Sequence, residues 1–135
     1  MKKILLISGS NRIGNTNYIL KMINENIENS ELILLKEKNI EYCKGCLACH
    51  NIEYCVLDDD INEIISKIID SDLIIFGVPN YFDNVSGLFK NFMDRLHPLY
   101  NGFSRGRSGG LVFPYLSEFS TVYHGPHSQR LWHSQ

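Results

Sequence analysis

The chain has 135 residues, 44% of them hydrophobic, and its thirteen basic and fifteen acidic residues give a formal net charge of −2. A chain of this length forms one domain and buries roughly two-thirds of the surface that it exposes when unfolded. The charges are spread along the sequence, so there is no basic patch of the kind that binds nucleic acid or a membrane surface. The composition therefore argues against polyanion binding and predicts a small globular protein.

A short apolar run near the amino terminus predicts a buried strand over residues 3–7. Its four apolar residues, Ile4 to Ile7, are too few for a signal-peptide core or a membrane span. We therefore expect a cytoplasmic protein, in whose reducing environment the four cysteines act as ligands or redox groups rather than as structural disulfides.

The next elements alternate between helix and strand. Asn15 and Thr16 are good helix caps, and the apolar residues that follow recur at helical spacing, which predicts a helix to about Asn29. Residues 31–35 are predicted to form the second strand. A second helix is predicted after the capping run Asp58–Asp60, because five isoleucines form a single apolar stripe: Ile61, Ile64, Ile65, Ile68 and Ile69.

The same alternation continues through a strand over residues 73–78 and a helix over residues 88–96 that stops before Pro98. Alternating elements of this length predict an α/β fold with a doubly wound parallel sheet and helices on both faces. A fourth strand is predicted over residues 110–115. No convincing fifth strand or amphipathic helix follows, so we expect a domain over residues 1–116 and, over residues 117–135, a tail, a swapped segment or non-native sequence.

The loop after the first strand has the features of a phosphate site. It joins a strand to the amino terminus of a helix, where free N–H groups and the helix dipole favour an anion. Ser10, Thr16 and Asn17 add hydrogen-bond donors. The loop has neither the G-x-G-x-x-G pattern of dinucleotide sites nor the lysine of a P-loop, which favours a monophosphate. The alternative is an ordinary capped loop.

The loop over residues 77–87 follows a neighbouring strand and would lie at the same edge of the sheet. Tyr81 and Phe82 are aromatic residues in a polar loop, where they could stack on a flat ring such as an isoalloxazine. The alternative for Tyr81 is core packing.

Together these two loops resemble the NADPH-dependent FMN reductase family, through G-S-N-R-I-G-N-T-N from Gly9 and G-V-P-N-Y-F-D-N-V-S-G-L-F-K-N-F-M-D-R from Gly77. The resemblance covers roughly residues 1–100 and implies a flavodoxin-like fold, a homo-oligomer and an FMN cofactor. Family members usually continue through a further flavin loop, a fifth strand and a last helix, so we expect a sheet shortened at the carboxyl terminus. The implied phosphate contacts are Ser10, Arg12, Asn15, Thr16 and Asn17, and the implied ring contacts are Pro79, Asn80, Tyr81 and Phe82.

Four cysteines, Cys43, Cys46, Cys49 and Cys55, lie within thirteen residues. Four soft ligands suit an iron-sulfur cluster or zinc. Their spacing resembles the compact motif of the iron-sulfur flavoproteins, a branch of the same family, which implies a four-iron four-sulfur cluster beside FMN. Two alternatives stay open. In a cluster-free relative Cys46, Cys49 and Cys55 would be packed thiols or a redox-active pair, and in a zinc site His50 could replace one thiol.

The sequence thus predicts FMN-dependent electron transfer with no catalytic side chain, because the cofactor carries the chemistry. NAD(P)H is a possible donor, and the partners are small-molecule or protein electron donors and acceptors. The alternatives are a cluster-free NAD(P)H-dependent FMN reductase and a non-catalytic flavin or metal binder. His97 is predicted only to end a helix, and Asp94 and Arg95 to form a solvated pair. A packing or disordered role is expected for three histidines of the predicted tail: His124, His127 and His133.

Overall fold

The computed structural model describes residues 2–99, 110–113 and 121–123. They form a five-stranded sheet in the order β2-β1-β3-β6-β7, in which every pairing is parallel except the antiparallel pairing of β6 with β7. The strands are β1 (Ile4–Ser8), β2 (Ser30–Leu34), β3 (Leu73–Gly77), β6 (Gly110–Phe113) and β7 (Thr121–Tyr123). The flavodoxin-like, doubly wound fold class predicted from the sequence is confirmed.

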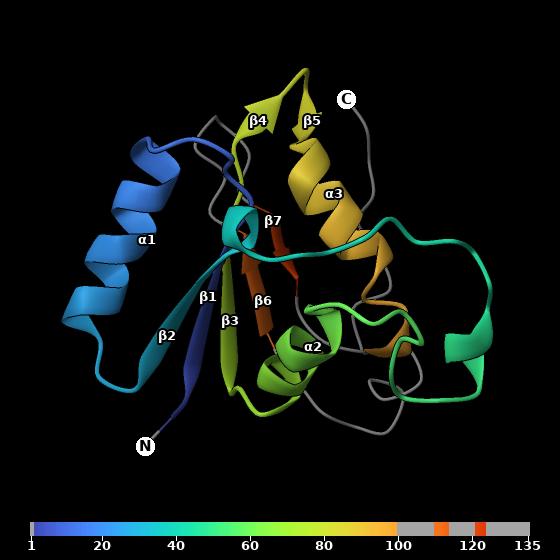
Figure 1. Ribbon diagram of the computed structural model, residues 1–135. Coiled ribbons are helices and arrows are strands. Elements are labelled where there is room, and N and C mark those ends of the chain that lie inside the picture. The colour runs from blue at the N-terminus through green and yellow to red at the C-terminus, as the bar shows by residue number, and fades with distance from the viewer. Residues whose placement is uncertain (1, 100–109, 114–120, 124–135) are drawn as a thin grey trace.

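Helices cover both faces of the sheet (Figure 1). Helix α1 (Asn15–Asn26) lies on one side, and α2 (Ile61–Ile69) and α3 (Gly87–Asp94) lie on the other. The 3-10 turns η1 (Leu35–Glu37) and η2 (Ala48–His50) lie between β2 and α2, and the two-stranded hairpin of β4 (Asn80–Tyr81) and β5 (Asn84–Val85) precedes α3.

Alternation along β1 divides the core between the two faces. Leu5 and Ile7 belong to the cluster that packs with α2 and α3, whereas Leu6 is buried outside that cluster, as is Leu20 of α1. The predicted stripe of α2 is confirmed, because Ile61, Ile64, Ile65 and Ile68 are all buried and only Ile69 is exposed. Burying four isoleucine side chains contributes several kcal/mol, at roughly 1.5–3 kcal/mol for each.

Three differences from the sequence predictions have local causes. Helix α1 ends at Asn26 rather than near Asn29, because the chain must turn into β2 and Asn29 does so at a φ of 59°. Residues 80–85 form the β4–β5 hairpin rather than an irregular loop. The expectation of no further strand after residue 115 is wrong, because β7 pairs with β6 and its three residues are too few to show a period. Pro114, Tyr115 and the tail histidines lie outside the described residues.

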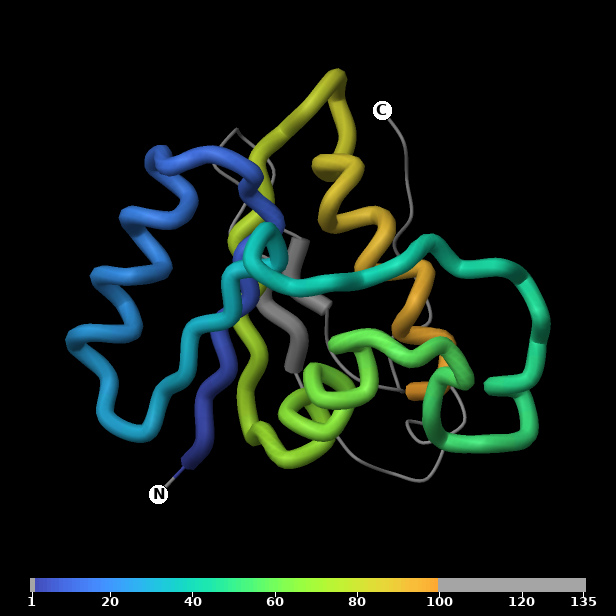
Figure 2. The backbone as a smooth tube through the Cα atoms, viewed as in Figure 1, coloured from blue at the N-terminus to red at the C-terminus, as the bar shows by residue number. Residues whose placement is uncertain are grey.

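The register of the sheet determines where a ligand could bind. Ser8 at the end of β1 is paired with Gly77 at the end of β3 and with Leu34 at the end of β2. The loops after all three strands therefore leave the same edge of the sheet. The segment between η1 and α2 then runs sideways past α3 before it turns back toward α2 (Figure 1 and Figure 2).

Candidate functional site at the carboxyl edge of the sheet

The loop between β1 and α1 is held in shape by its own polar side chains. The Ser8 hydroxyl donates to Asn17 Oδ1 and accepts from the Ser10 N–H at 3.2 Å. The carbonyl of Arg12 accepts both from the Ser10 hydroxyl and from the Asn17 side-chain amide, each at 3.0 Å. The loop is therefore preformed, with Ser10 and Asn17 occupied within it.

The structure places all five predicted phosphate contacts in this loop and the first turn of α1. Ser10 and Thr16 are buried, Asn17 is half-buried, and Arg12 and Asn15 are exposed. The prediction that Asn15 and Thr16 cap the helix is wrong, because the cap position is Gly14 and no side chain there accepts a hydrogen bond. The first N–H groups of a helix have no intrahelical acceptor, so this uncapped terminus is open to an anion.

The β1–α1 loop packs closely against α3, and the end of β3 packs closely against α1. A methyl group added at Gly9 would lie 2.7 Å from Phe89 Cβ, and one added at Gly77 would lie 2.5 Å from Leu20 Cδ1. The Ser86 hydroxyl donates to the Gly9 carbonyl at 2.6 Å and accepts from the Phe89 N–H at 3.2 Å. Ser86 thus caps α3 and also fixes the two predicted cofactor loops to one another. Sequence reasoning missed it, although its place before the apolar helix over residues 88–96 is a helix-cap signal.

The β4–β5 hairpin presents the predicted ring contacts. Pro79 is half-buried, while Asn80, Tyr81 and Phe82 are exposed. Phe82 has an exposed fraction of 104% and a φ of 51°, and the next residue, Asp83, has a φ of 56°. Bulky side chains rarely adopt this left-handed conformation, and such strain concentrates at functional sites. The exposed position of Tyr81 argues against the alternative that it packs in the core.

The four cysteines lie in the segment between η1 and α2. None forms a disulfide; Cys43 and Cys46 are exposed, and Cys49 and Cys55 are half-buried. Gly45 and Leu47 both have positive φ angles, which bends the chain repeatedly between the first three thiols. Within residues 2–99, 110–113 and 121–123, no group of three or more histidine, cysteine or acidic side chains is placed to hold a metal ion. The predicted ligand set stays a prediction.

Two histidines accompany Cys49. Its sulfur lies 3.5 Å from His97 Nδ1, and the His97 ring stacks on the His50 ring with centroids 4.5 Å apart. Burial raises the pKa of the Cys49 thiol, and the charges of the other three cysteines act in the same direction. His97 therefore lies against the cysteine segment, which its position after α3 did not indicate.

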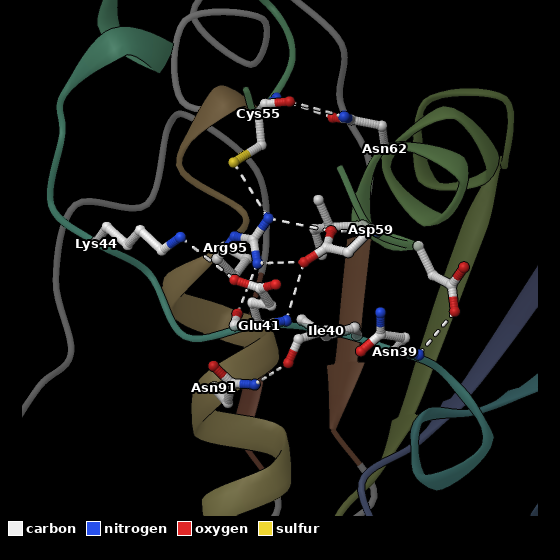
Figure 3. Close-up of polar contacts among 11 residues, drawn as sticks. Asn39, Ile40, Glu41, Lys44, Cys55, Asp59, Asn62, Asn91 and Arg95 are labelled. Atoms are coloured by element: carbon white, nitrogen blue, oxygen red, sulfur yellow. Dashed lines mark hydrogen bonds and ion pairs between the residues drawn. The ribbon is translucent and has the colours of Figure 1, made fainter. Parts of the chain in front are cut away.

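A buried ion pair lies at the base of this segment (Figure 3). Arg95, just after α3, contacts Asp59, just before α2, through Nη1 at 2.7 Å and Nη2 at 3.1 Å, and both side chains are fully buried. The prediction of a solvated Asp94–Arg95 pair is wrong, because Asp94 pairs with Lys90 and Arg95 turns inward. The sequence did not indicate this pair, because an aspartate just before a helix is usually explained by capping. Asp59 also has that role, since its side chain accepts a hydrogen bond from the Ile61 N–H.

Electrostatics within the pair favour full ionisation. Burial alone would raise the pKa of Asp59, but hydrogen bonds from Arg95 and from the N–H groups of Glu41 and Ile61 outweigh it and lower that pKa. Burial likewise opposes the charge on Arg95, but its contacts with Asp59 and Cys55 leave the Arg95 pKa raised. The pair therefore carries one positive and one negative charge at neutral pH.

A pocket of about 580 Å³ adjoins both candidate sites. Asn11 of the β1–α1 loop lines it on one side, Tyr42 and Cys43 line it on another, and Gly87 and Asn91 contribute the start of α3. The pocket thus lies between the β1–α1 loop, the cysteine segment and the start of α3.

Among the described helices, none combines the length and the apolar character that crossing a bilayer requires.

The family model for NADPH-dependent FMN reductase matches residues 2–113. The chain belongs to that family. An iron-sulfur flavoprotein of Archaeoglobus fulgidus is 40% identical over 97 residues, which cover 69% of this chain and 48% of the relative. One from Methanocaldococcus jannaschii is 40% identical over 117 residues, which cover 82% and 60%. This member of the FMN reductase family spans about half the length of the curated relatives it matches.

Solved structures agree on the fold. A flavone reductase superposes on this family member with a TM-score of 0.56 at 26% identity, covering 76% of this chain and 32% of that protein. An azoreductase from Bacillus anthracis gives a TM-score of 0.52 at 14% identity, covering 71% and 55%, and supports the fold alone.

Proposed function

We propose that this protein binds FMN between the β1–α1 loop and the β4–β5 hairpin and transfers electrons through it. The observation that carries the proposal is the Ser86–Gly9 hydrogen bond, which fixes an uncapped helix terminus and an exposed aromatic hairpin beside one another. Bound FMN would supply hydride and single-electron chemistry. The protein's part is to hold the phosphate at the α1 terminus, beside Arg12 and Asn15, and to place the flat ring against Tyr81 and Phe82.

Comparing FMN with riboflavin tests the phosphate part. The two ligands differ only in the phosphate, which charge-assisted hydrogen bonds at the α1 terminus should recognise by roughly 1.5–3 kcal/mol. Calorimetry should therefore give an FMN dissociation constant at least about tenfold lower than that of riboflavin. Equal affinities would mean that the β1–α1 loop is an ordinary turn.

We further propose that Cys43, Cys46, Cys49 and Cys55 hold a four-iron four-sulfur cluster. Four cysteine thiols, none of them in a disulfide, are the donor set that such clusters use. A buried guanidinium beside Cys55 complements the negative charge of a thiolate ligand, and its Nε has no hydrogen-bond partner among the described residues. The relatives named iron-sulfur flavoprotein support the same assignment. When bound, the cluster would exchange single electrons.

Anaerobic purification and the Cys43→Ala variant test this assignment. The wild type should carry about four iron and four sulfide per chain. Cys43→Ala should lose or destabilise the iron and keep FMN, because the flavin loops lie on other elements. Stoichiometric zinc, or no metal and no sulfide under strict anaerobiosis, would contradict the cluster and leave the flavin proposal standing.

A cluster-free NAD(P)H-dependent reductase is the second candidate function. The exposed positions of Cys43 and Cys46 favour it, since the described residues do not gather three ligands. NAD(P)H oxidation with added FMN, in metal-free protein, would support this candidate. No turnover in either form would leave a non-catalytic flavin or metal binder.

We also propose protein or small-molecule electron partners, self-association and a reducing compartment such as the cytoplasm. Four cysteines without a disulfide in a short, largely exposed segment support the compartment, because an oxidising environment would favour disulfides among them.

A further inference from the structure

Arg95 makes more contacts than an ion pair requires. Besides Asp59, its Nη1 donates to the Glu41 carbonyl at 2.6 Å and its Nη2 donates to Cys55 Sγ at 3.2 Å (Figure 3). Glu41 lies two residues before the first cysteine of the segment, and Cys55 is the last. One guanidinium therefore holds both ends of the cysteine segment.

Neighbouring side chains fix the same two ends. The Asn62 side chain exchanges two hydrogen bonds with the Cys55 backbone, both at 2.8 Å. The Asn91 amide donates to the Ile40 carbonyl at 2.9 Å. Cys55 is thus held through its backbone by α2 and through its sulfur by Arg95, whereas Cys43 and Cys46 are exposed. The fold therefore determines the position of the Cys55 sulfur.

Stability alone does not account for a buried pair of this kind. Removing two charges from water costs several kcal/mol each, and apolar residues of similar volume are often as stabilising or more so. Arg95 also keeps a buried Nε without an acceptor among the described residues. What an apolar replacement could not provide is a positive N–H donor aimed at Sγ of Cys55.

We propose that Arg95 is a positioning residue that holds the Cys55 sulfur by an N–H···S hydrogen bond and raises the reduction potential of a cluster bound through that sulfur. The inference rests on the cluster of the proposed function. Hydrogen bonds to ligand sulfurs and nearby positive charge stabilise the more negative, reduced cluster, so their removal makes the potential more negative. Asp59 sets the orientation of the guanidinium and offsets part of its charge.

The test compares variants of the anaerobically purified full chain by dithionite titration, with the reduced cluster followed by electron paramagnetic resonance. Arg95→Met should shift the cluster potential to a more negative value, and Arg95→Lys should shift it less. The double variant Arg95→Met/Asp59→Asn removes both charges, so it should fold even where Arg95→Met does not. It should still show the negative shift, because the N–H···S donor is gone. Lys90→Met is the matched control, since Lys90 is an exposed cation on α3.

The outcomes separate this inference from the function on which it rests. A negative shift in the Arg95 variants, with an unchanged potential in Lys90→Met and FMN retained in all, supports the role of Arg95. Wild-type potential in an Arg95 variant that holds full iron and sulfide overturns the inference and leaves the cluster standing. An equal shift in Lys90→Met also overturns it, because the effect would then be general electrostatics. Wild-type protein without iron and sulfide overturns the proposed cluster and the inference with it.

Discussion

Phe82 and Asp83 occupy the tip of the β4–β5 hairpin in a conformation that costs each of them free energy. Their φ angles of 51° and 56° match a type I′ turn, in which Asn and Gly are the preferred residues. The left-handed conformation costs roughly 1–2 kcal/mol for a residue with a side chain. Phe82 is fully exposed, so packing in the described structure does not offset this cost. A bound flat ring would do so.

Replacing Phe82 with glycine should therefore have opposite effects on stability and on binding. Phe82→Gly should raise the free energy of unfolding of the flavin-free protein by up to about 1 kcal/mol, because glycine adopts positive φ without strain. It should also weaken FMN binding by roughly 1 kcal/mol, the scale of an aromatic stacking contact. Urea unfolding and calorimetric FMN titration measure the two effects.

Asp83→Gly is the matched control for this prediction. It relieves the same kind of strain one residue later and leaves the aromatic ring in place. We expect a similar gain in stability and an unchanged FMN affinity. Equal losses of FMN affinity in both variants would mean that hairpin rigidity, rather than the Phe82 ring, holds the flavin.

Residue types indicated the two loops that we propose to bind flavin, but they did not indicate the buried ion pair at the base of the cysteine segment. A strand that is followed by Gly, Ser, Asn and Thr indicates a loop that leads into a helix. The structure has such a loop between the end of β1 at Ser8 and the start of α1 at Asn15. Arg95 follows an acidic residue near a helix end, a pattern that is common on surfaces, and its partner is 36 residues away. A pairing over that distance leaves no periodic signal in the sequence.

At the level of elements, the Asp59–Arg95 pair joins α2 to α3. The sequence predicted both helices because their apolar residues recur at helical spacing, and the structure confirms them at Ile61–Ile69 and Gly87–Asp94. Their polar connection could not be predicted, because each charged residue had a local interpretation at a helix end. The β4–β5 hairpin was missed for a similar reason, since strands of two residues are too short to alternate.

The depressed pKa of Asp59 predicts how this connection responds to acid. The ordinary pKa of the carboxyl is 3.8, and the folded value lies below it. The stabilisation from ionised Asp59 is therefore fully present above about pH 4, and it is lost as the pH falls below 3.8 through the folded pKa. Asp59→Asn should cost about 3–5 kcal/mol at pH 7, because it leaves Arg95 buried without its counter-charge.

Urea unfolding of the wild type and Asp59→Asn across pH 3 to 7 checks this prediction. The difference in unfolding free energy should stay constant from pH 7 to about pH 5 and shrink below pH 4. If the difference in unfolding free energy between the two proteins instead grew as the pH fell, the folded pKa of Asp59 would not be depressed. Glu25→Gln is a suitable control, because Glu25 is exposed and pairs only weakly with Lys21 at 3.8 Å.

For the whole molecule, the order β2-β1-β3-β6-β7 brings three loops to one edge, and alternation alone was enough to predict such a sheet. The antiparallel β7 was not predicted, because a short edge strand is specified by its neighbour more than by its own residues.

The outer surface of α1 carries two exposed apolar residues one turn apart, Tyr18 and Met22, and Ile13 is exposed just before the helix.

Self-association is the prediction that belongs to this scale. We expect a dimer or a pair of dimers by light scattering, because clustered apolar side chains on a surface mark interaction sites. Tyr18→Glu with Met22→Glu should shift the protein toward the monomer if α1 lies in the interface. Lys21→Gln on the same helix is the control, since it removes an exposed charge without changing the apolar surface. A wild-type monomer at high protein concentration would refute self-association.

Arg95 hydrogen-bonds to Glu41 and to Cys55, and so fixes both ends of the cysteine segment. This has a consequence for how the length and sequence of that segment can vary. A loop whose ends are already fixed has little further closure cost, since doubling its length costs only about 0.6 kcal/mol. The residues between those two ends can therefore be lengthened, shortened or exchanged while the sheet, the β1–α1 loop and the β4–β5 hairpin keep their structure. The cysteine segment could therefore be exchanged for one that carries a different set of metal ligands, without redesign of the rest of the fold.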